Sequence, residues 1–132
     1  MLNMTATESP EKIYTAALRE RKSKDPLKRR EACEKGWLAV MEAVDEFLAS
    51  KGRVIPKGTA DSHVKRNAAL ADLADQDPSL VALKQMVSDI ADSLHGACFY
   101  GNQESPYYDK LLKRTVRDIL EKTGHPVHDI VE

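Results

Sequence analysis

A Ser or Asp followed directly by Pro recurs four times along the chain, at Ser9-Pro10, Asp25-Pro26, Asp77-Pro78 and Ser105-Pro106. The side-chain oxygen of Ser or Asp accepts a hydrogen bond from a free backbone N–H in the first turn of a helix. Proline suits the first helical position because its φ is already fixed and it has no N–H to leave unpaired. Each pair therefore predicts the start of a helix. A fifth start is expected at Asp61 or Ser62, where a capping residue follows a loop that contains Gly and Pro.

Three glycines indicate where the predicted helices end. Gly52, Gly101 and Gly124 each follow a helical pattern, and glycine readily adopts the left-handed conformation that ends many helices. Starts and ends together predict helices over residues 10–23, 26–51, 62–75, 78–100 and 106–122.

Apolar residues recur at spacings of three and four within the long segments, as in Trp37, Val40, Val44 and Leu48 of the second. Each such helix has one apolar stripe to bury, and no stretch alternates as a strand does. Short connections make neighbouring helices antiparallel. The sequence predicts an all-α fold, an antiparallel up-and-down four-helix bundle with one additional short helix. At 132 residues it is expected to be one domain, 1–132, with a core over 10–122 and flexible termini at 1–8 and 124–132.

Several classes of protein are not expected. The longest unbroken apolar run, Trp37 to Met41, is five residues long, whereas a membrane-spanning helix needs about 20. The first ten residues lack the basic start and apolar core of a secretory signal. Cys33 and Cys98 are too few for a disulfide framework and are expected to be reduced. These features predict a cytoplasmic protein that does not bind a membrane.

Polar residues interrupt the apolar stripes near the middle of the chain, and burying them costs energy unless they are paired. The residues that could converge into a polar pocket are Glu34, His63, Arg66, His95, Tyr100 and Asn102. In such a pocket a carboxylate orients an imidazole, and Arg66 binds an anion. In the alternative, His63 caps or packs its own helix end, His95 bonds to a nearby carbonyl, and Arg66 points outward.

A basic segment connects the first two helices. It contains seven basic residues against two acidic ones, a local charge of +5, and could bind phosphate groups of a nucleic acid. The alternative is a solvated elbow between two helices. The candidate contacts are Arg19, Arg21, Lys22, Lys24, Lys28, Arg29 and Arg30.

Signals for a metal or a cofactor are weak. Cys33, Cys98, His63 and His95 are of the residue types that bind zinc, but neither the two cysteines nor the two histidines form a closely spaced pair. No glycine-rich loop is followed by the Lys-Ser/Thr pair of a phosphate loop. We therefore expect no metal and no cofactor.

Trp37 is expected in the core. His125 and His128 lie beyond the last helix, where a mobile tail is expected.

Two stretches carry a family resemblance. The run ACEKGWLAVMEAVDEFL, from Ala32 to Leu48, resembles the long central helix of small HEPN-like proteins. The run LHGACFYGN, from Leu94 to Asn102, resembles the Leu-His, then Phe/Tyr-Tyr signature of two short branches, the archaeal PaREP-type proteins and uncharacterised bacterial single-domain proteins. Ser62-His63 also stands where the archaeal branch tends to carry Ser-His. The resemblance covers roughly residues 28–122.

The resemblance implies a helical bundle that is often dimeric and that handles nucleotides or RNA, in several members as a ribonuclease. The ribonuclease members carry Arg, four to six residues, then His. His63 and His95 have no arginine at that distance, and seven residues separate Arg117 from His125. The resemblance therefore favours a non-catalytic module that forms a homodimer and binds a nucleotide, RNA or a protein. The alternatives are a phosphodiesterase that uses His63, His95, Glu34 and Arg66, and a purely structural bundle.

Overall fold

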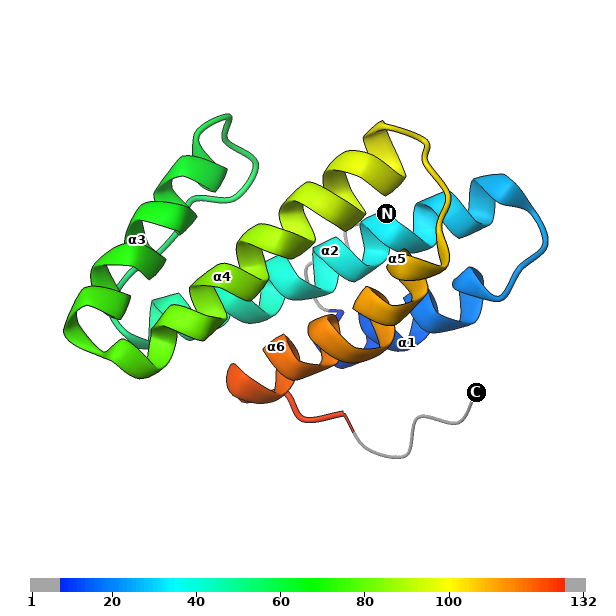
Figure 1. Ribbon diagram of the computed structural model, residues 1–132. Coiled ribbons are helices and arrows are strands. Elements are labelled where there is room, and N and C mark those ends of the chain that lie inside the picture. The colour runs from blue at the N-terminus through cyan, green and yellow to red at the C-terminus, as the bar shows by residue number, and fades with distance from the viewer. Residues whose placement is uncertain (1–7, 128–132) are drawn as a thin grey trace.

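In the computed structural model, which describes residues 8–127, every element of secondary structure in that range is a helix (Figure 1). The chain begins with a hairpin of α1 (Pro10–Arg21) and α2 (Pro26–Ser50), and α3 (Ser62–Gln76) follows a loop. Two composite rods complete the described fold. The first contains the 3₁₀ turn η2 (Pro78–Leu80), α4 (Val81–Ile90) and the π-helical η3 (Ala91–Tyr100); the second contains α5 (Pro106–Lys110), the π-helical η4 (Leu111–Val116) and α6 (Arg117–Lys122).

All four Ser/Asp-Pro pairs begin helices, as the sequence predicts. The capping oxygens of Ser9, Asp25, Asp77 and Ser105 accept from the backbone N–H groups of Lys12, Leu27, Ser79 and Tyr107, at 3.0 to 3.2 Å. The fifth helix begins at Ser62, but the Asp61 side chain makes no capping hydrogen bond.

The helix ends agree with prediction at Gly52 and Gly124, whose φ angles are 78° and 92°. At the end of η3, Gly101 is not left-handed; the next residue, Asn102, takes that conformation with φ 52°. Asparagine tolerates it because its short polar side chain can bond locally. Gly101 is needed for another reason, since a Cβ there would lie 2.6 Å from the carbonyl oxygen of Ala97.

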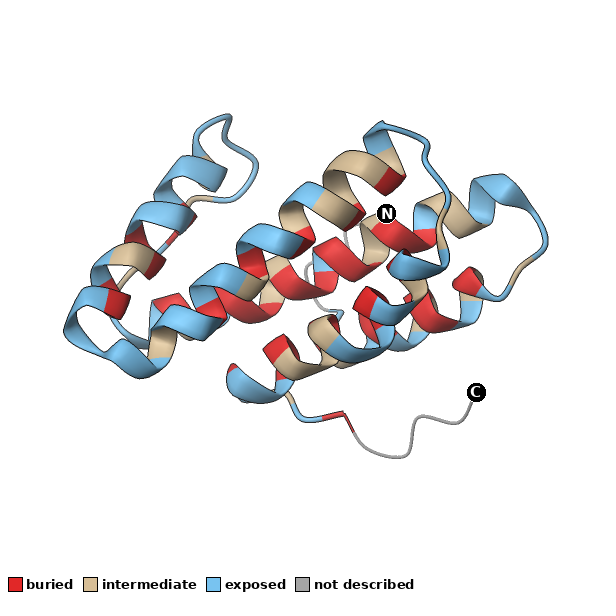
Figure 2. Ribbon diagram, viewed as in Figure 1, coloured by how far each residue is buried: buried red, intermediate tan, exposed pale blue. Residues whose placement is uncertain are grey.

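Helix α2 occupies the centre of the molecule and packs against α1 and both composite rods (Figure 2). Its apolar stripe is buried together with those of the rods, and the largest fully buried side chains include Trp37, Leu48, Ile90, Leu94, Leu112 and Ile119. Gly36 permits this close approach, because a Cβ there would lie 2.5 Å from Cδ1 of Leu112 and 3.2 Å from Cδ1 of Leu94.

Helix α3 lies to one side, along α4 and near the C-terminal half of α2 (Figure 1). Leu70 and Leu73 of α3 are buried, whereas Val64 is exposed. In the described part of the chain, no helix combines the length and the apolar character that crossing a membrane requires.

A disulfide joins Cys33 of α2 to Cys98 of η3, so the expectation of two reduced cysteines is wrong for this structure. The residues are 65 positions apart in the sequence, and their Cα atoms lie 6.2 Å apart. Sequence spacing could not reveal the pair, because it forms only when the two helices pack antiparallel with both cysteines in the shared interface.

Candidate functional site

Trp37 in α2 lies at the centre of a cluster of rings. The indole is 1% exposed. His63 from α3 stacks on it, with ring centroids 5.7 Å apart and planes 18° apart, and His95 from η3 lies 5.5 Å away. The two imidazoles are 5.6 Å from each other. Three separate helices thus bring one indole and two imidazoles together, and we call Trp37, His63, His95, Glu34 and Tyr100 the Trp37 cluster.

A carboxylate orients one of the imidazoles. Glu34 stands three residues before Trp37, hence on the same side of α2, and its Oε1 lies 2.7 Å from Nδ1 of His95. An ionised carboxylate only accepts hydrogen bonds, so Nδ1 carries the proton and Nε2 of neutral His95 has the free lone pair. The Glu34 and His95 side chains are 26% and 23% exposed, so solvent reaches both.

An arginine holds the other imidazole. Nη1 of Arg66 lies 3.3 Å from Nδ1 of His63, and because a guanidinium only donates, Nδ1 is the acceptor. Neutral His63 therefore carries its proton on Nε2. Burial, the charge of Arg66 and the proximity of His95, in that order, lower the pKa of His63 below 6.5. His63 is accordingly a neutral hydrogen-bond donor at pH 7.

Arg66 itself is not an anion-binding group. Its guanidinium is buried and bonds to both carboxylate oxygens of Asp45, from Nε at 2.6 Å and from Nη2 at 2.9 Å. The prediction that Arg66 binds an anion is wrong for this arrangement, because its charge is already paired inside the protein. Arg66 positions His63 instead. Asp45 was not singled out from the sequence. The available signal was its position next to Val44, in the apolar stripe of the helix that the structure buries.

Of the remaining two residues predicted for the pocket, Tyr100 belongs to the Trp37 cluster and Asn102 does not. The Tyr100 ring meets His95 edge-on, with centroids 4.9 Å apart, and is 69% exposed. It also contacts Phe99, over which Arg30 places its guanidinium at 5.2 Å from the ring centroid. Asn102 lies outside the Trp37 cluster and lines a neighbouring cavity with Arg30 and Cys98.

The indole N–H of Trp37 is buried and has no hydrogen-bond partner among the described residues. Trp37 belongs to the core, as the sequence predicts, but buried donors are nearly always paired. An unpaired donor in the ring that both imidazoles contact distinguishes this cluster from ordinary apolar packing.

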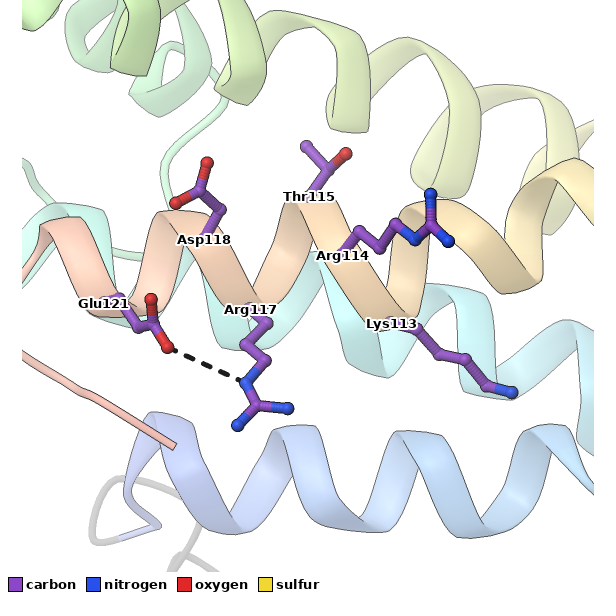
Figure 3. A pocket seen from close by; sticks show the side chains of 6 residues that line it. All are labelled: Lys113, Arg114, Thr115, Arg117, Asp118 and Glu121. Carbon is purple, nitrogen blue, oxygen red and sulfur yellow. Dashed lines mark ion pairs between the residues drawn. The ribbon is translucent and has the colours of Figure 1, made fainter. Parts of the chain in front are cut away.

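A second hollow lies along η4 and α6 (Figure 3). All its lining side chains come from this one helical rod, and Arg117 pairs with Glu121 within it, at 3.7 Å. This is a charged, solvated helix face. The lining residues are Lys113, Arg114, Thr115, Arg117, Asp118 and Glu121.

Within residues 8–127, no group of three or more His, Cys, Asp or Glu side chains is placed to hold a metal ion. The zinc alternative considered from the sequence also lacks its sulfur ligands, because Cys33 and Cys98 are bonded to each other.

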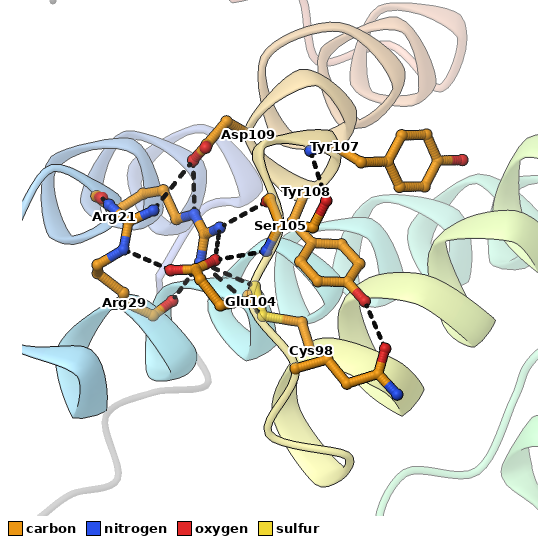
Figure 4. A network of polar contacts seen from close by, with 10 residues as sticks. Arg21, Arg29, Cys98, Glu104, Ser105, Tyr107, Tyr108 and Asp109 are labelled. Atoms are coloured by element: carbon orange, nitrogen blue, oxygen red, sulfur yellow. Dashed lines mark hydrogen bonds and ion pairs between the residues drawn. A yellow bond between two sulfur atoms is a disulfide. The ribbon is translucent and has the colours of Figure 1, made fainter.

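Some side chains of the basic segment are bonded within the protein, where they hold the fold together (Figure 4). Arg21 is only 5% exposed; its Nε donates to Asp109 at 2.6 Å and its Nη2 to Glu104. Arg29 also bonds to Glu104, and Arg30 donates to the carbonyl of Phe99. The prediction of a nucleic-acid contact is therefore wrong for Arg21, which the fold buries and pairs. Exposed basic side chains remain at Arg19, Lys22, Lys24 and Lys28.

His125 does not lie in a free tail. Its Nδ1 is 3.1 Å from Glu11 and its Nε2 is 2.7 Å from Glu46, so it connects the segment after α6 to α1 and α2. Of the termini predicted to be flexible, 1–8 and 124–132, residues 1–7 and 128–132 lie outside the described residues, and His128 with them.

Comparisons with protein-family models, with curated proteins and with solved structures found no match for this chain.

Proposed function

We propose that the chain is a non-catalytic module that binds a nucleotide, or an unstacked base of an RNA strand, at the Trp37 cluster. The observation that carries this proposal is the meeting of His63 and His95 on Trp37, with complementary free nitrogens. In its neutral form His95 offers an acceptor at Nε2, and His63 offers a donor at Nε2. Nucleobase edges present donors and acceptors side by side, which such a pair can bond.

Exposed rings supply the second part of base recognition. Tyr100 presents most of its ring to solvent at the edge of the cluster, and His63 is exposed as well. Bases stack on aromatic rings regardless of sequence, and each such contact contributes about 1–3 kcal/mol.

Positive charge near Tyr100 suits a phosphate. Arg30 lies over Phe99, whose ring contacts Tyr100 at 5.0 Å between centroids. The exposed cations Lys24 and Lys28 lie on the same elbow as Arg30. If a nucleotide places its base on the Trp37 cluster and its phosphate toward the elbow, the phosphate would lie near these cations. The basic side chains that remain exposed would contact the phosphates of a longer RNA.

Trp37 is the only tryptophan, so its fluorescence reports on the cluster. Titration with AMP is expected to change this fluorescence saturably, and ribose 5-phosphate, which has no base, is expected to leave it unchanged. Tyr100→Ala should weaken AMP binding by roughly 5- to 150-fold, the equivalent of one lost stacking contact. Tyr107→Ala is the matched control, since Tyr107 is also exposed but lies on α5. Equal AMP affinity of the two variants would contradict the proposal.

Phosphodiester cleavage is the second candidate, favoured by the bond between Glu34 and His95. A carboxylate that fixes Nδ1–H leaves Nε2 able to take a proton from a ribose 2′-hydroxyl as it attacks the adjacent phosphate. Incubation with a short single-stranded RNA tests it. A 2′,3′-cyclic phosphate product that disappears in His95→Gln would support cleavage, and intact RNA with retained binding would leave the module non-catalytic.

We also propose that the helices form an up-and-down four-helix bundle of the HEPN-like type, with α3 as the additional helix, and that the chain is a cytoplasmic homodimer. The packing of α1, α2 and both composite rods around one core supports the bundle. Exposed apolar side chains at Leu27, Val81 and Tyr107 are available for a dimer contact. Sedimentation equilibrium should give twice the mass of the 14.7 kDa chain.

A further inference from the structure

A buried cation lies against the disulfide (Figure 4). Nη1 of Arg21 is 3.6 Å from Sγ of Cys33 and 3.9 Å from Sγ of Cys98. Other donors of Arg21 are bound by Asp109 and Glu104, so the guanidinium is fixed in place. A disulfide carries no charge for this cation to stabilise. A thiolate released from the disulfide would carry one, and a neighbouring arginine favours a thiolate over a thiol.

A cavity of about 290 Å³ lies next to one of the two cysteines, whose side chain is itself 1% exposed. Cys98 lines this cavity and Cys33 does not. The charged side chains that line it are those of Arg21, Arg29, Arg30 and Glu104. Arg21 and Arg29 are paired with Glu104 and Asp109, so the excess positive charge comes from Arg30, which has no carboxylate partner among the described residues. Such a cavity suits a small thiol that carries carboxylate groups.

We propose that Cys33–Cys98 is a thiol–disulfide exchange site whose co-substrate is a small anionic thiol bound in this arginine-lined cavity. The thiolate of that molecule attacks Sγ of Cys98, the S–S bond breaks, and Cys33 leaves as a thiolate beside Arg21. A second thiolate then attacks the mixed disulfide and releases Cys98. The protein gains two electrons and two protons, and two molecules of the thiol become one disulfide.

The exchange site adjoins the Trp37 cluster, and this step rests on the proposed function. Cys33 and Glu34 are neighbours on α2, while Cys98 and His95 are one turn apart on η3. The disulfide and the Glu34–His95 bond therefore join the same two helices at adjacent points. Reduction removes the covalent link and leaves the end of η3, with His95 and Tyr100, held by weaker contacts. The reduced protein is expected to bind AMP more weakly than the oxidised protein.

Exchange is tested on the full oxidised chain without any nucleotide. Reduced glutathione, which carries net negative charge, is compared with cysteamine, a cationic thiol, at equal thiolate concentration. Alkylation and mass spectrometry follow the loss of the disulfide. Glutathione thiolate is expected to react at least about tenfold faster, which corresponds to about 1.4 kcal/mol, and the trapped mixed disulfide is expected on Cys98. Equal rates, or glutathione attached to Cys33, would overturn the proposal.

Matched variants identify the source of the preference. Arg30→Gln removes a cation from the cavity and should reduce the preference for glutathione several-fold, whereas Lys28→Gln, outside the cavity on the same helix, should preserve it. Equal effects of the two variants would count against the cavity as the binding site.

The role of Arg21 is measured without altering it. In Cys33→Ser the single thiol of Cys98, which lines the cavity and lies 3.9 Å from Nη1 of Arg21, should reach half of its maximal iodoacetamide reactivity at least about one pH unit below free cysteine. Reactivity like that of free cysteine would contradict stabilisation by Arg21.

The two proposals fail separately. If the oxidised protein does not bind AMP but shows the glutathione preference, the proposed function is wrong and the exchange site stands. If it binds AMP but reacts equally with both thiols, only the exchange site is wrong. Equal AMP affinity of oxidised and reduced protein would overturn the coupling between them.

Discussion

Glu34 and His95 are 61 residues apart in the chain, yet their side chains meet at 2.7 Å beside the disulfide that joins the same two helices. This contact fixes the imidazole that packs against Trp37 and Tyr100. It is the point at which the helical scaffold, the ring cluster and the proposed exchange site adjoin one another.

Replacing Glu34 by Gln should affect binding more than stability. The substitution keeps the shape but replaces the carboxylate that orients His95, so AMP affinity should fall about tenfold, or about 1.4 kcal/mol. The pair is partly exposed, so the free energy of unfolding should fall by less than about 1 kcal/mol. Fluorescence titration and urea unfolding measure the two effects. Glu42 is on the same helix as Glu34 and forms a surface pair with Lys57 of the following loop, and Glu42→Gln should bind AMP normally.

The titration of His63 should be visible in Trp37 fluorescence, because the two rings are stacked. Burial and the charge of Arg66 lower the pKa of His63, so the quenching attributable to its protonation should have a midpoint below 6.5. The difference between the pH profiles of the unmodified protein and His63→Gln isolates this signal from that of His95. A midpoint at or above 6.5 would contradict the environment described for His63.

The same lowered pKa has a consequence for stability. As the pH falls below 6.5, the unfolded chain protonates His63 more readily than the folded protein does. The contribution of His63 to stability is therefore complete above that pH and declines as the pH falls toward the lowered pKa. Urea unfolding at several pH values should show this decline in the unmodified protein and a weaker one in His63→Gln.

Removing only one partner of the Arg66–Asp45 ion pair should lower the free energy of unfolding strongly. Arg66→Met leaves the buried Asp45 carboxylate without a partner, which costs about 3–5 kcal/mol of unfolding free energy. Adding Asp45→Leu should recover most of the loss, because the pair is then replaced by apolar side chains. Urea unfolding of the single and double variants measures both. A double variant no more stable than Arg66→Met alone would show that the buried charge is not the cause.

Two glycines should respond in opposite directions to alanine. Gly36→Ala places a Cβ against Leu112 and Leu94 in the core, so overpacking of about 1–3 kcal/mol should exceed the gain in helix propensity. At Gly96 the nearest atom to a new Cβ is 3.4 Å away, an ordinary contact. Gly96→Ala should therefore gain up to about 1 kcal/mol. Thermal unfolding compares the pair, and a stabilised Gly36→Ala would contradict the packing described for α2.

Local sequence was sufficient for the helices themselves. The Ser or Asp oxygen before each proline bonds to a backbone N–H two or three residues later, so the start of each helix is determined within a single turn. The apolar stripe of α2 is likewise a property of one segment, and Trp37 and Leu48 are buried as expected. Glu34, His63, Arg66 and His95 do lie close together, because polar groups on buried stripes must find partners, and a pocket formed by them stays a prediction.

Tertiary structure decided which partner each of those groups found. Three sets of contacts join segments that are far apart in the chain: Cys33 with Cys98, Arg66 with Asp45, and Arg21 with Asp109 of α5 and Glu104 of the loop before it. Each depends on the rotation and axial position of one helix relative to another, and a stripe spaced every three or four residues fixes neither. The sequence thus determined which residues form each helix and which face of each helix is buried. Only their packing determined that Arg66 is neutralised, that the cysteines are joined, and that two imidazoles lie against one indole.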